Sequence, residues 1–107
     1  MNFTDKKCVP CEGSMPPFTA KQIAGYQPHI SDEWAIISNA RLCRQFKFED
    51  FKIAMIFVNK VADLAESEGH HPDIKISWNK VTIELTTHAI KGLSENDFII
   101  AAKIEKL

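Results

Sequence analysis

Two short runs of alternating apolar and polar residues constrain the fold more than any other feature of this chain. The runs cover residues 74–78 and 81–87, and their apolar members are Ile74, Ile76, Trp78, Val81, Ile83 and Leu85. A period of two with one apolar face is typical of a strand that is buried on one side. The two runs therefore predict a β-hairpin with its turn at Asn79-Lys80.

The position of this turn sets the expected pairing of the hairpin. A two-residue turn there sets apolar residues opposite one another, and the expected pairs are Trp78 with Val81, Ile76 with Ile83, and Ile74 with Leu85. Extended outward, the same register sets His71 opposite His88, where directly opposed Cβ atoms lie about 4.5–5.5 Å apart. His70 lies one residue away. We therefore expect imidazoles to gather at the open end of the hairpin.

Three of the four histidines would then share one small volume. Imidazole both accepts and donates protons near neutral pH, so such a group can protonate a leaving group and deprotonate a neighbouring atom. Zinc binding is the rival interpretation. Adjacent residues of an extended chain point to opposite faces, and the sequence has no H-x-x-x-H spacing. We favour proton transfer and predict no metal. His29 lies in a loop and is interpreted as a surface residue.

Composition is typical of one globular domain that spans residues 1–107. The chain is 45% hydrophobic and 25% charged, with a formal net charge of −1, which gives no electrostatic attraction to nucleic acid or to a membrane surface. It contains no apolar run of about 18 residues and no apolar segment near its first residue. We expect a cytoplasmic protein with no direct nucleic-acid or membrane partner.

Residues 1–18 are expected to form an extended leader, because prolines and a glycine interrupt them. The leader contains Cys8 and Cys11 in a C-x-x-C spacing, and the chain has three cysteines. An odd count argues against a disulfide framework, and a single C-x-x-C is only half of a zinc site. We interpret the motif as incidental or locally structural, with a functional role as the alternative.

Three helices are predicted. Thr19 and Gln22 form a capping-box pattern before a helix over 20–26 that Pro28 ends. A long helix covers 49–67 and stops at Gly69, and its apolar stripe consists of Phe51, Ala54, Met55, Val58, Val61, Ala62 and Ala65. Ser94, paired with Asp97, caps a last helix that reaches 106, and its apolar residues are Phe98, Ile99, Ala101, Ala102 and Leu107.

A further hairpin is predicted over 33–38 and 41–48, with its turn at Asn39-Ala40. The element order is therefore α-β-β-α-β-β-α. This order predicts an α+β fold with a four-stranded antiparallel sheet and helices packed on one face. The free edges of such a sheet favour pairing with another subunit, so we expect a homodimer or homotetramer.

The spacing around the histidines resembles the signature of the pterin-4a-carbinolamine dehydratases. That signature is Glu66, three residues, His70-His71-Pro72, five residues, Trp78, nine residues, His88, eight residues and Asp97. The resemblance covers roughly residues 15–107. Animal members commonly carry arginine immediately before the last aspartate, where this chain has Asn96.

The resemblance implies a site and its residues. His70 and His88 would be the proton-transfer pair, and His71 would bind and orient the pterin. The residues beside them that would line the pocket are Gly69, Pro72, Thr86, Thr87 and Ala89. Supporting positions would be Glu66, Trp78 and Asp97. From the residues alone, Glu66 is equally a solvated carboxylate at a helix end, and Asp97 is a capping residue.

The resemblance also implies an activity that uses no cofactor. The family removes water from 4a-hydroxytetrahydropterin to give quinonoid dihydropterin, which regenerates the cofactor of aromatic amino acid hydroxylases. The alternative is a non-enzymatic interaction protein, because relatives also act as a dimerisation cofactor of a transcription factor or as assembly factors with degenerate active sites. The complete set of histidines here favours the enzyme.

Overall fold

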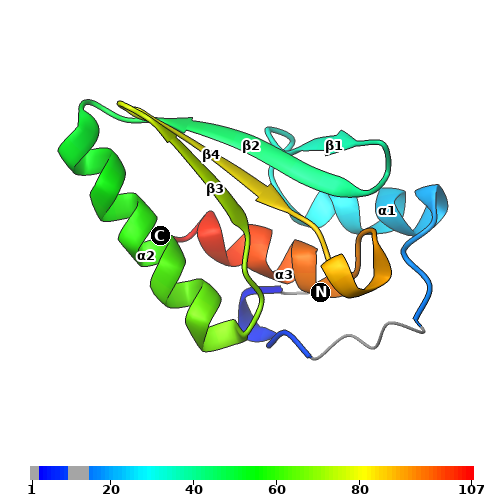
Figure 1. Ribbon diagram of the computed structural model, residues 1–107. Coiled ribbons are helices and arrows are strands. Elements are labelled where there is room, and N and C mark those ends of the chain that lie inside the picture. The colour runs from blue at the N-terminus through cyan, green and yellow to red at the C-terminus, as the bar shows by residue number, and fades with distance from the viewer. Residues whose placement is uncertain (1–2, 10–14) are drawn as a thin grey trace.

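A four-stranded antiparallel sheet with helices on one face forms the protein in the computed structural model, which describes residues 3–9 and 15–107 (Figure 1). The strands are β1 (Ala35–Ile37), β2 (Arg41–Lys47), β3 (Asp73–Ser77) and β4 (Lys80–Leu85). The α-helices are α1 (Ala20–Tyr26), α2 (Phe51–Glu68) and α3 (Glu95–Ile104). Three short 3-10 turns are η1 (Phe3–Asp5), η2 (Gln27–His29) and η3 (His88–Ile90). The predicted fold class and element order are confirmed.

The core lies between the sheet and the helices. The sheet order is β1-β2-β4-β3, so β4 is central and turns alternate apolar side chains inward. The fully buried residues of the two central strands are Leu42, Val81, Ile83 and Leu85. Helix α3 crosses beneath the sheet in Figure 1 and is buried on almost every side. Burial of such side chains stabilises the fold by about 1.5–3 kcal/mol each.

Helix ends lie at or near the predicted positions, although the residue that caps the start of α2 was not predicted. Thr19 and Gln22 form the capping box of α1, and the chain passes through Pro28 in η2. Asp50 caps α2, where its side chain accepts from the backbone N–H of Ile53. Gly69 ends α2 with φ 65°, a left-handed conformation that glycine adopts without steric cost. This turn directs the chain from the helix into His70.

The predicted register of the second hairpin is wrong by two residues. The observed pairs include Ile74 with Ile83 and Ile76 with Val81, so the turn is at Trp78 and Asn79. A shift of two keeps every side chain on its face, so alternation cannot distinguish the two registers. Contacts of Asn79 with Phe48 favour the observed register. The side-chain amide of Asn79 donates to the Phe48 carbonyl at 3.0 Å, and the backbone carbonyl of Asn79 accepts from the Phe48 N–H at 2.8 Å.

The other predicted boundaries need smaller corrections. Strand β1 is only three residues long, and its loop to β2 covers 38–40, with Ser38 and Asn39 at positive φ. In α2, Phe57 belongs to the buried stripe, whereas Phe51 is 49% exposed and Ala62 is also exposed. Helix α3 ends at Ile104, and Leu107 beyond it is exposed.

The described part of the leader, residues 3–9, is packed against the domain and begins with a 3-10 turn that the sequence did not predict. The Phe3 ring is buried and stacks on Tyr26 with ring centroids 5.4 Å apart. Exposed His29 contacts the same Phe3 ring edge-on. Figure 1 shows this segment running beneath α3 toward the C-terminal end of α2. Cys11 lies outside the described residues.

Tyr26 provides a direct test of the packing of α1 against α3, because it is the single tyrosine of the chain and its titration can be followed alone. Its hydroxyl donates to the Glu95 carboxylate at 2.7 Å, and this hydrogen bond, with burial, raises the pKa of Tyr26 to about 12. The neutral phenol therefore stabilises the fold below pH about 10, the usual tyrosine value, and this stabilisation is lost as pH rises through about 12.

We expect an ultraviolet titration of the folded protein to show phenolate forming near pH 12 and not near pH 10. In concentrated urea the midpoint should return to about 10. Glu95→Gln serves as the matched control, because it removes the carboxylate and should lower the folded midpoint. A folded-state midpoint at the ordinary tyrosine value would contradict the Tyr26–Glu95 contact.

None of the helices within the described ranges is both long enough and apolar enough to span a lipid bilayer.

Candidate active site

A pocket of about 250 Å³ lies where α2 ends, β3 begins and η3 follows β4. Its lining residues in the described part of the chain are Val9, Gly69, His70, His71, Thr86, Thr87, His88, Ala89 and Asn96. The three histidines predicted to converge do line one pocket. Its volume is slightly below the ~300–1,000 Å³ that is usual for sites of drug-sized ligands, so the pocket suits a small molecule.

The reason for the convergence differs from the predicted one. His71 and His88 are not ladder partners, because strand pairing ends at Asp73 opposite Glu84. His70 and His71 follow the left-handed turn at Gly69, while His88 begins η3 after β4 has ended. The tertiary arrangement of a helix end and a 3-10 turn thus brings the imidazoles together, and the strand register does not.

His70 is held by a buried carboxylate. Its Nε2 lies 2.7 Å from Asp97 Oδ1, the His70 side chain is 12% exposed and Asp97 is completely buried. An ionised carboxylate only accepts hydrogen bonds, so His70 donates through Nε2–H. In the neutral ring, Nδ1 is then the nitrogen that can accept a proton. A histidine oriented by an aspartate in this way is a recurring arrangement for a general base.

Asp97 is itself fixed by two further donors. Its Oδ2 accepts from the Thr87 hydroxyl at 2.8 Å and from the backbone N–H of Ser94 at 3.0 Å. The Ser94 contact is the capping interaction predicted from sequence, and the His70 contact gives the same side chain a second role. Three donors around one buried carboxylate satisfy it and hold it in one position. The start of α3 is therefore linked directly to the His70 ring.

The remaining two histidines are more exposed. His71 Nε2 lies 2.7 Å from Glu66 Oε1, and the two side chains are 61% and 79% exposed. An exposed pair of this kind adds little to stability, but it orients the His71 ring at the pocket rim. The His88 ring has no hydrogen-bond partner within residues 3–9 and 15–107 and is open to solvent at the pocket. It is therefore accessible to a ligand in the pocket.

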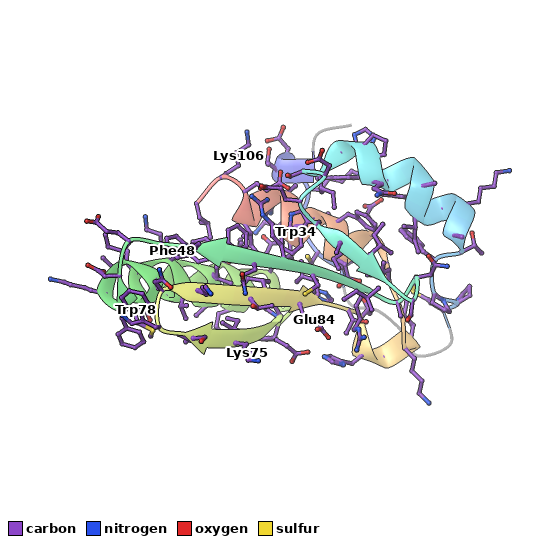
Figure 2. All side chains as sticks on the ribbon, turned by 90° about the horizontal axis from the view of Figure 1, so that it is seen from above. Trp34, Phe48, Lys75, Trp78, Glu84 and Lys106 are labelled. Carbon is purple, nitrogen blue, oxygen red and sulfur yellow. The ribbon has the colours of Figure 1, made fainter. Side chains whose placement is uncertain are left out.

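Two of the predicted site residues lie elsewhere. Pro72 does not line the pocket. Trp78 is 66% exposed at the tip of the β3–β4 hairpin, with φ 50°. Figure 2 shows it at the end of the hairpin beside Phe48, away from the turn that carries His88. Any contribution of Trp78 to the pocket is therefore indirect.

Two lining residues were not predicted to be there. Val9 belongs to the leader, and nothing in the hydrophobic pattern marks it. Asn96 was singled out only as the position where animal relatives carry arginine. Its side chain is buried and bonds the Val9 backbone, with Oδ1 accepting the N–H at 3.0 Å and Nδ2 donating to the carbonyl at 2.6 Å. This contact brings the leader to the pocket.

Outside residues 1–2 and 10–14, no group of three or more histidine, cysteine, aspartate or glutamate side chains is arranged to hold an ion. The buried acceptor nearest the histidines, Asp97, is already occupied by three donors.

This fold and pocket define a small α+β protein with a pocket lined by three histidines. The chain matches the family model for pterin 4 alpha carbinolamine dehydratase over residues 16–107. It therefore belongs to the pterin-4-alpha-carbinolamine dehydratase family, which is a family of hydro-lyase enzymes. The described leader segment, residues 3–9, precedes the part that the family model matches.

Known relatives agree with this assignment. A protein of Alkaliphilus metalliredigens that carries the provisional name pterin-4-alpha-carbinolamine dehydratase is 48% identical over 105 residues, which cover 98% of this chain and 95% of the relative. A relative from Rickettsia bellii with the same provisional name is 46% identical over 106 residues, covering 99% and 94%. These alignments extend beyond the matched family region at the N-terminal side, because they leave almost none of this chain uncovered.

Two solved structures share the fold. A transcriptional coactivator/pterin dehydratase from Brucella melitensis has a TM-score of 0.77 at 30% identity, covering 84% of this chain and 96% of that one. A pterin dehydratase-like protein identified as a RuBisCO assembly factor of the alpha-carboxysome has a TM-score of 0.59 at 24% identity, covering 69% and 87%. At that identity, the second structure supports the fold alone.

Proposed function

We propose that the protein dehydrates 4a-hydroxytetrahydropterin to quinonoid dihydropterin by histidine acid–base catalysis, with no metal or organic cofactor. The observation that carries this proposal is the single pocket lined by His70, His71 and His88 in a chain of this family. In this reaction the C4a–O bond breaks as the hydroxyl leaves as water, and a ring N–H proton is lost. One group must donate a proton and another must accept one.

The environments of the histidines favour different roles for them. Asp97 places a buried negative charge against His70, which stabilises the imidazolium that forms when His70 accepts a proton. We therefore assign His70 as the base for the ring N–H proton. His88 is exposed at the solvent side of the pocket and is assigned as the acid that protonates the departing hydroxyl. His71, oriented by Glu66, would bind and orient the pterin.

The remaining pocket residues would surround the pterin. Gly69 is the left-handed turn that places His70, and Thr86 and Thr87 lie between the end of β4 and η3. The hydroxyl of Thr86 is committed to the Ala40 carbonyl at 2.8 Å, and that of Thr87 to Asp97. The backbone of Thr87 is committed as well, because its N–H donates to the Gly92 carbonyl at 2.9 Å and its carbonyl accepts from the Ile90 N–H at 3.2 Å. The backbone groups of Thr86 and Ala89 are therefore the ones that could contact a ligand at this edge of the pocket.

The decisive experiment for this function is the rate of 4a-hydroxytetrahydropterin loss with and without the protein, because the reaction also proceeds spontaneously. The substrate is generated in a rapid-mixing experiment, and its decay to quinonoid dihydropterin is followed by absorbance. We expect the decay rate to rise in proportion to protein concentration and to be unaffected by chelators. A decay rate equal to the spontaneous one at every protein concentration would refute the proposal.

In the cell, this reaction would return spent tetrahydropterin to aromatic amino acid hydroxylases. A cytoplasmic location is part of the proposal, and the free thiols of Cys8 and Cys43 support it, because free thiols are typical of reducing compartments. The alternative function is that of an interaction protein. The name of the Brucella melitensis structure, transcriptional coactivator/pterin dehydratase, supports this alternative. Recovery of one stoichiometric partner by a protein without dehydratase activity would favour that alternative.

We further propose that the protein is a homodimer or homotetramer. Several large apolar side chains of α2 and the neighbouring hairpin are 39–66% exposed, and these are Phe51, Ile53, Ile56, Ile76 and Trp78. They lie on the first half of α2 and on the β3–β4 hairpin, whose tip adjoins the start of α2 in Figure 1. Large exposed apolar surfaces are typical of protein interfaces, and β3 is also a free edge strand.

Light scattering should therefore give a mass of two or four times the 12.1 kDa of the chain. Ile56→Asp places a charge in the apolar region and is expected to weaken self-association by at least about tenfold. Ser67→Asp, at the other end of α2, is the matched control and should leave the mass unchanged. A wild-type mass of 12.1 kDa at all concentrations would exclude the oligomer.

A further inference from the structure

The leader segment 6–9 is fixed beside the pocket by several contacts with α2 and α3. The backbone N–H of Cys8 donates to Glu68 Oε1 at 2.8 Å, and Lys103 donates to the other oxygen of that carboxylate at 2.8 Å. Earlier in the segment, Lys6 pairs with Glu95 at 3.2 Å. These contacts hold the segment across the two helices whose ends form the pocket.

The Cys8 contact is largely shielded from water. The side chains of Glu68 and Lys103 are only 6% and 15% exposed. Burial opposes ionisation of Glu68, but hydrogen bonds from Lys103 and from the Cys8 backbone outweigh it and hold the pKa of Glu68 below its usual range. Burial, together with this carboxylate, raises the pKa of the Cys8 thiol to about 12. The Cys8 thiol should therefore react slowly while the segment stays in place.

Asn96 holds the next residue. Its buried side-chain amide bonds both the N–H and the carbonyl of Val9, at 3.0 and 2.6 Å. A side chain that hydrogen-bonds both the N–H and the carbonyl of one residue fixes the position and the orientation of that residue. Asn96 precedes Asp97, which holds His70. The same turn of α3 therefore positions both the leader and the base assigned above.

The Val9 side chain lies exposed at the rim of the pocket. Val9 lines the cavity together with the three histidines, yet it is 64% exposed. Most of the other lining residues carry polar groups, so Val9 supplies an apolar surface to the rim. A fused, planar pterin ring has two flat faces that are poorly solvated. Contact between one face and the isopropyl group of Val9 would remove apolar surface of the ring and of the side chain from water.

We propose that Val9 is a substrate-contacting residue that covers one face of the bound pterin, and that Asn96 is the positioning residue that holds it there. This inference rests on the proposed function. It adds that the leader segment forms one wall of the pterin pocket. Because the wall contacts the ring and takes no part in proton transfer, it stabilises the ground state and the transition state equally. Its loss should therefore raise KM and leave kcat unchanged.

Coupling between bound pterin and the leader must be reciprocal. If bound pterin contacts Val9, pterin must stabilise the fixed position of the leader by the same factor by which the leader strengthens pterin binding. Cys8 reports this directly, since its thiol is protected only while the segment stays in place. Saturating pterin should slow alkylation of Cys8, measured on its peptide by mass spectrometry.

The test compares Val9→Ser and Asn96→Ala with wild type. Val9→Ser leaves the fold unaltered and should raise KM about fivefold with kcat within about twofold, because it removes apolar contact area without removing a catalytic group. Val9→Ile should keep the wild-type KM. Asn96→Ala should raise KM similarly and also speed Cys8 alkylation. Lys7→Ala changes an exposed residue of the same segment that makes none of the hydrogen bonds described above, and it is the matched control.

The outcomes separate this inference from the proposed function. A wild-type protein that does not accelerate dehydration refutes the function, and with it the pterin as the ligand of Val9. An active wild type with an unchanged KM in Val9→Ser refutes the leader inference alone. A fall in kcat at constant KM would also overturn it, because that result assigns the segment to the chemical step. Cys8 alkylation that is insensitive to a non-reacting 7,8-dihydropterin, in an active protein, would contradict the reciprocal coupling.

Discussion

His70→Ala and His88→Ala are each expected to lower kcat for pterin dehydration by about 10²–10⁴-fold, the usual contribution of a general acid or base. His70 would lose the proton acceptor that Asp97 orients at 2.7 Å. His88 would lose the proton donor at the solvent side of the pocket. Rapid-mixing kinetics at saturating pterin measure kcat directly, and far-UV circular dichroism checks that the fold is retained.

The control for both variants is His29→Ala, whose exposed ring lies in η2, outside the pocket residues. Its kcat should stay within about twofold of wild type, because surface substitutions leave such sites unaltered. His71→Ala should raise KM more than it lowers kcat, in line with a binding role. Full activity in both His70→Ala and His88→Ala would show that another group transfers the protons.

Asp97→Ala is expected to have the largest effect on stability. It removes a completely buried acceptor that holds His70, Thr87 and the start of α3. Leaving these donors without a partner should cost about 3–5 kcal/mol in the free energy of unfolding. Urea denaturation measures this change, and Asp63→Ala, at an exposed position on α2, should stay within about 0.5 kcal/mol of wild type.

Asp97→Asn distinguishes the structural role of this residue from its role in catalysis. The amide is nearly isosteric but carries no charge, so it keeps part of the packing and loses the stabilisation of the His70 imidazolium. We expect kcat to fall by at least about tenfold at temperatures where the variant remains folded. An Asp97→Asn variant with wild-type kcat would mean that Asp97 acts on the fold alone.

Local sequence patterns predicted most of the fold because the interactions that set them are local. Thr19, Ser94 and Gly69 act within one helical turn, and each predicted helix end lies at or near its capping residue. The hairpin register could not be predicted in the same way. It depends on Asn79 bonding Phe48, a contact between residues 31 positions apart that alternation of apolar residues does not encode.

The site was predictable only in part for the same reason. The histidine spacing identified the cluster, but the predicted pairing of His71 with His88 was wrong, and a helix end and a 3-10 turn bring the rings together instead. The dual role of Asp97 requires the tertiary structure, because capping and histidine contacts use different oxygens of one carboxylate. Val9 reaches the pocket through two hydrogen bonds with Asn96, 87 positions away, which no local pattern reveals.

The most direct test of this account is a crystal structure of the protein with a non-reacting 7,8-dihydropterin. We predict that the ring lies in the 250 Å³ pocket, with the imidazoles of His70 and His88 within hydrogen-bond distance of it and His71 beside it. A pterin bound elsewhere on the molecule, or one that only a single imidazole can reach, would contradict proton transfer by this pair.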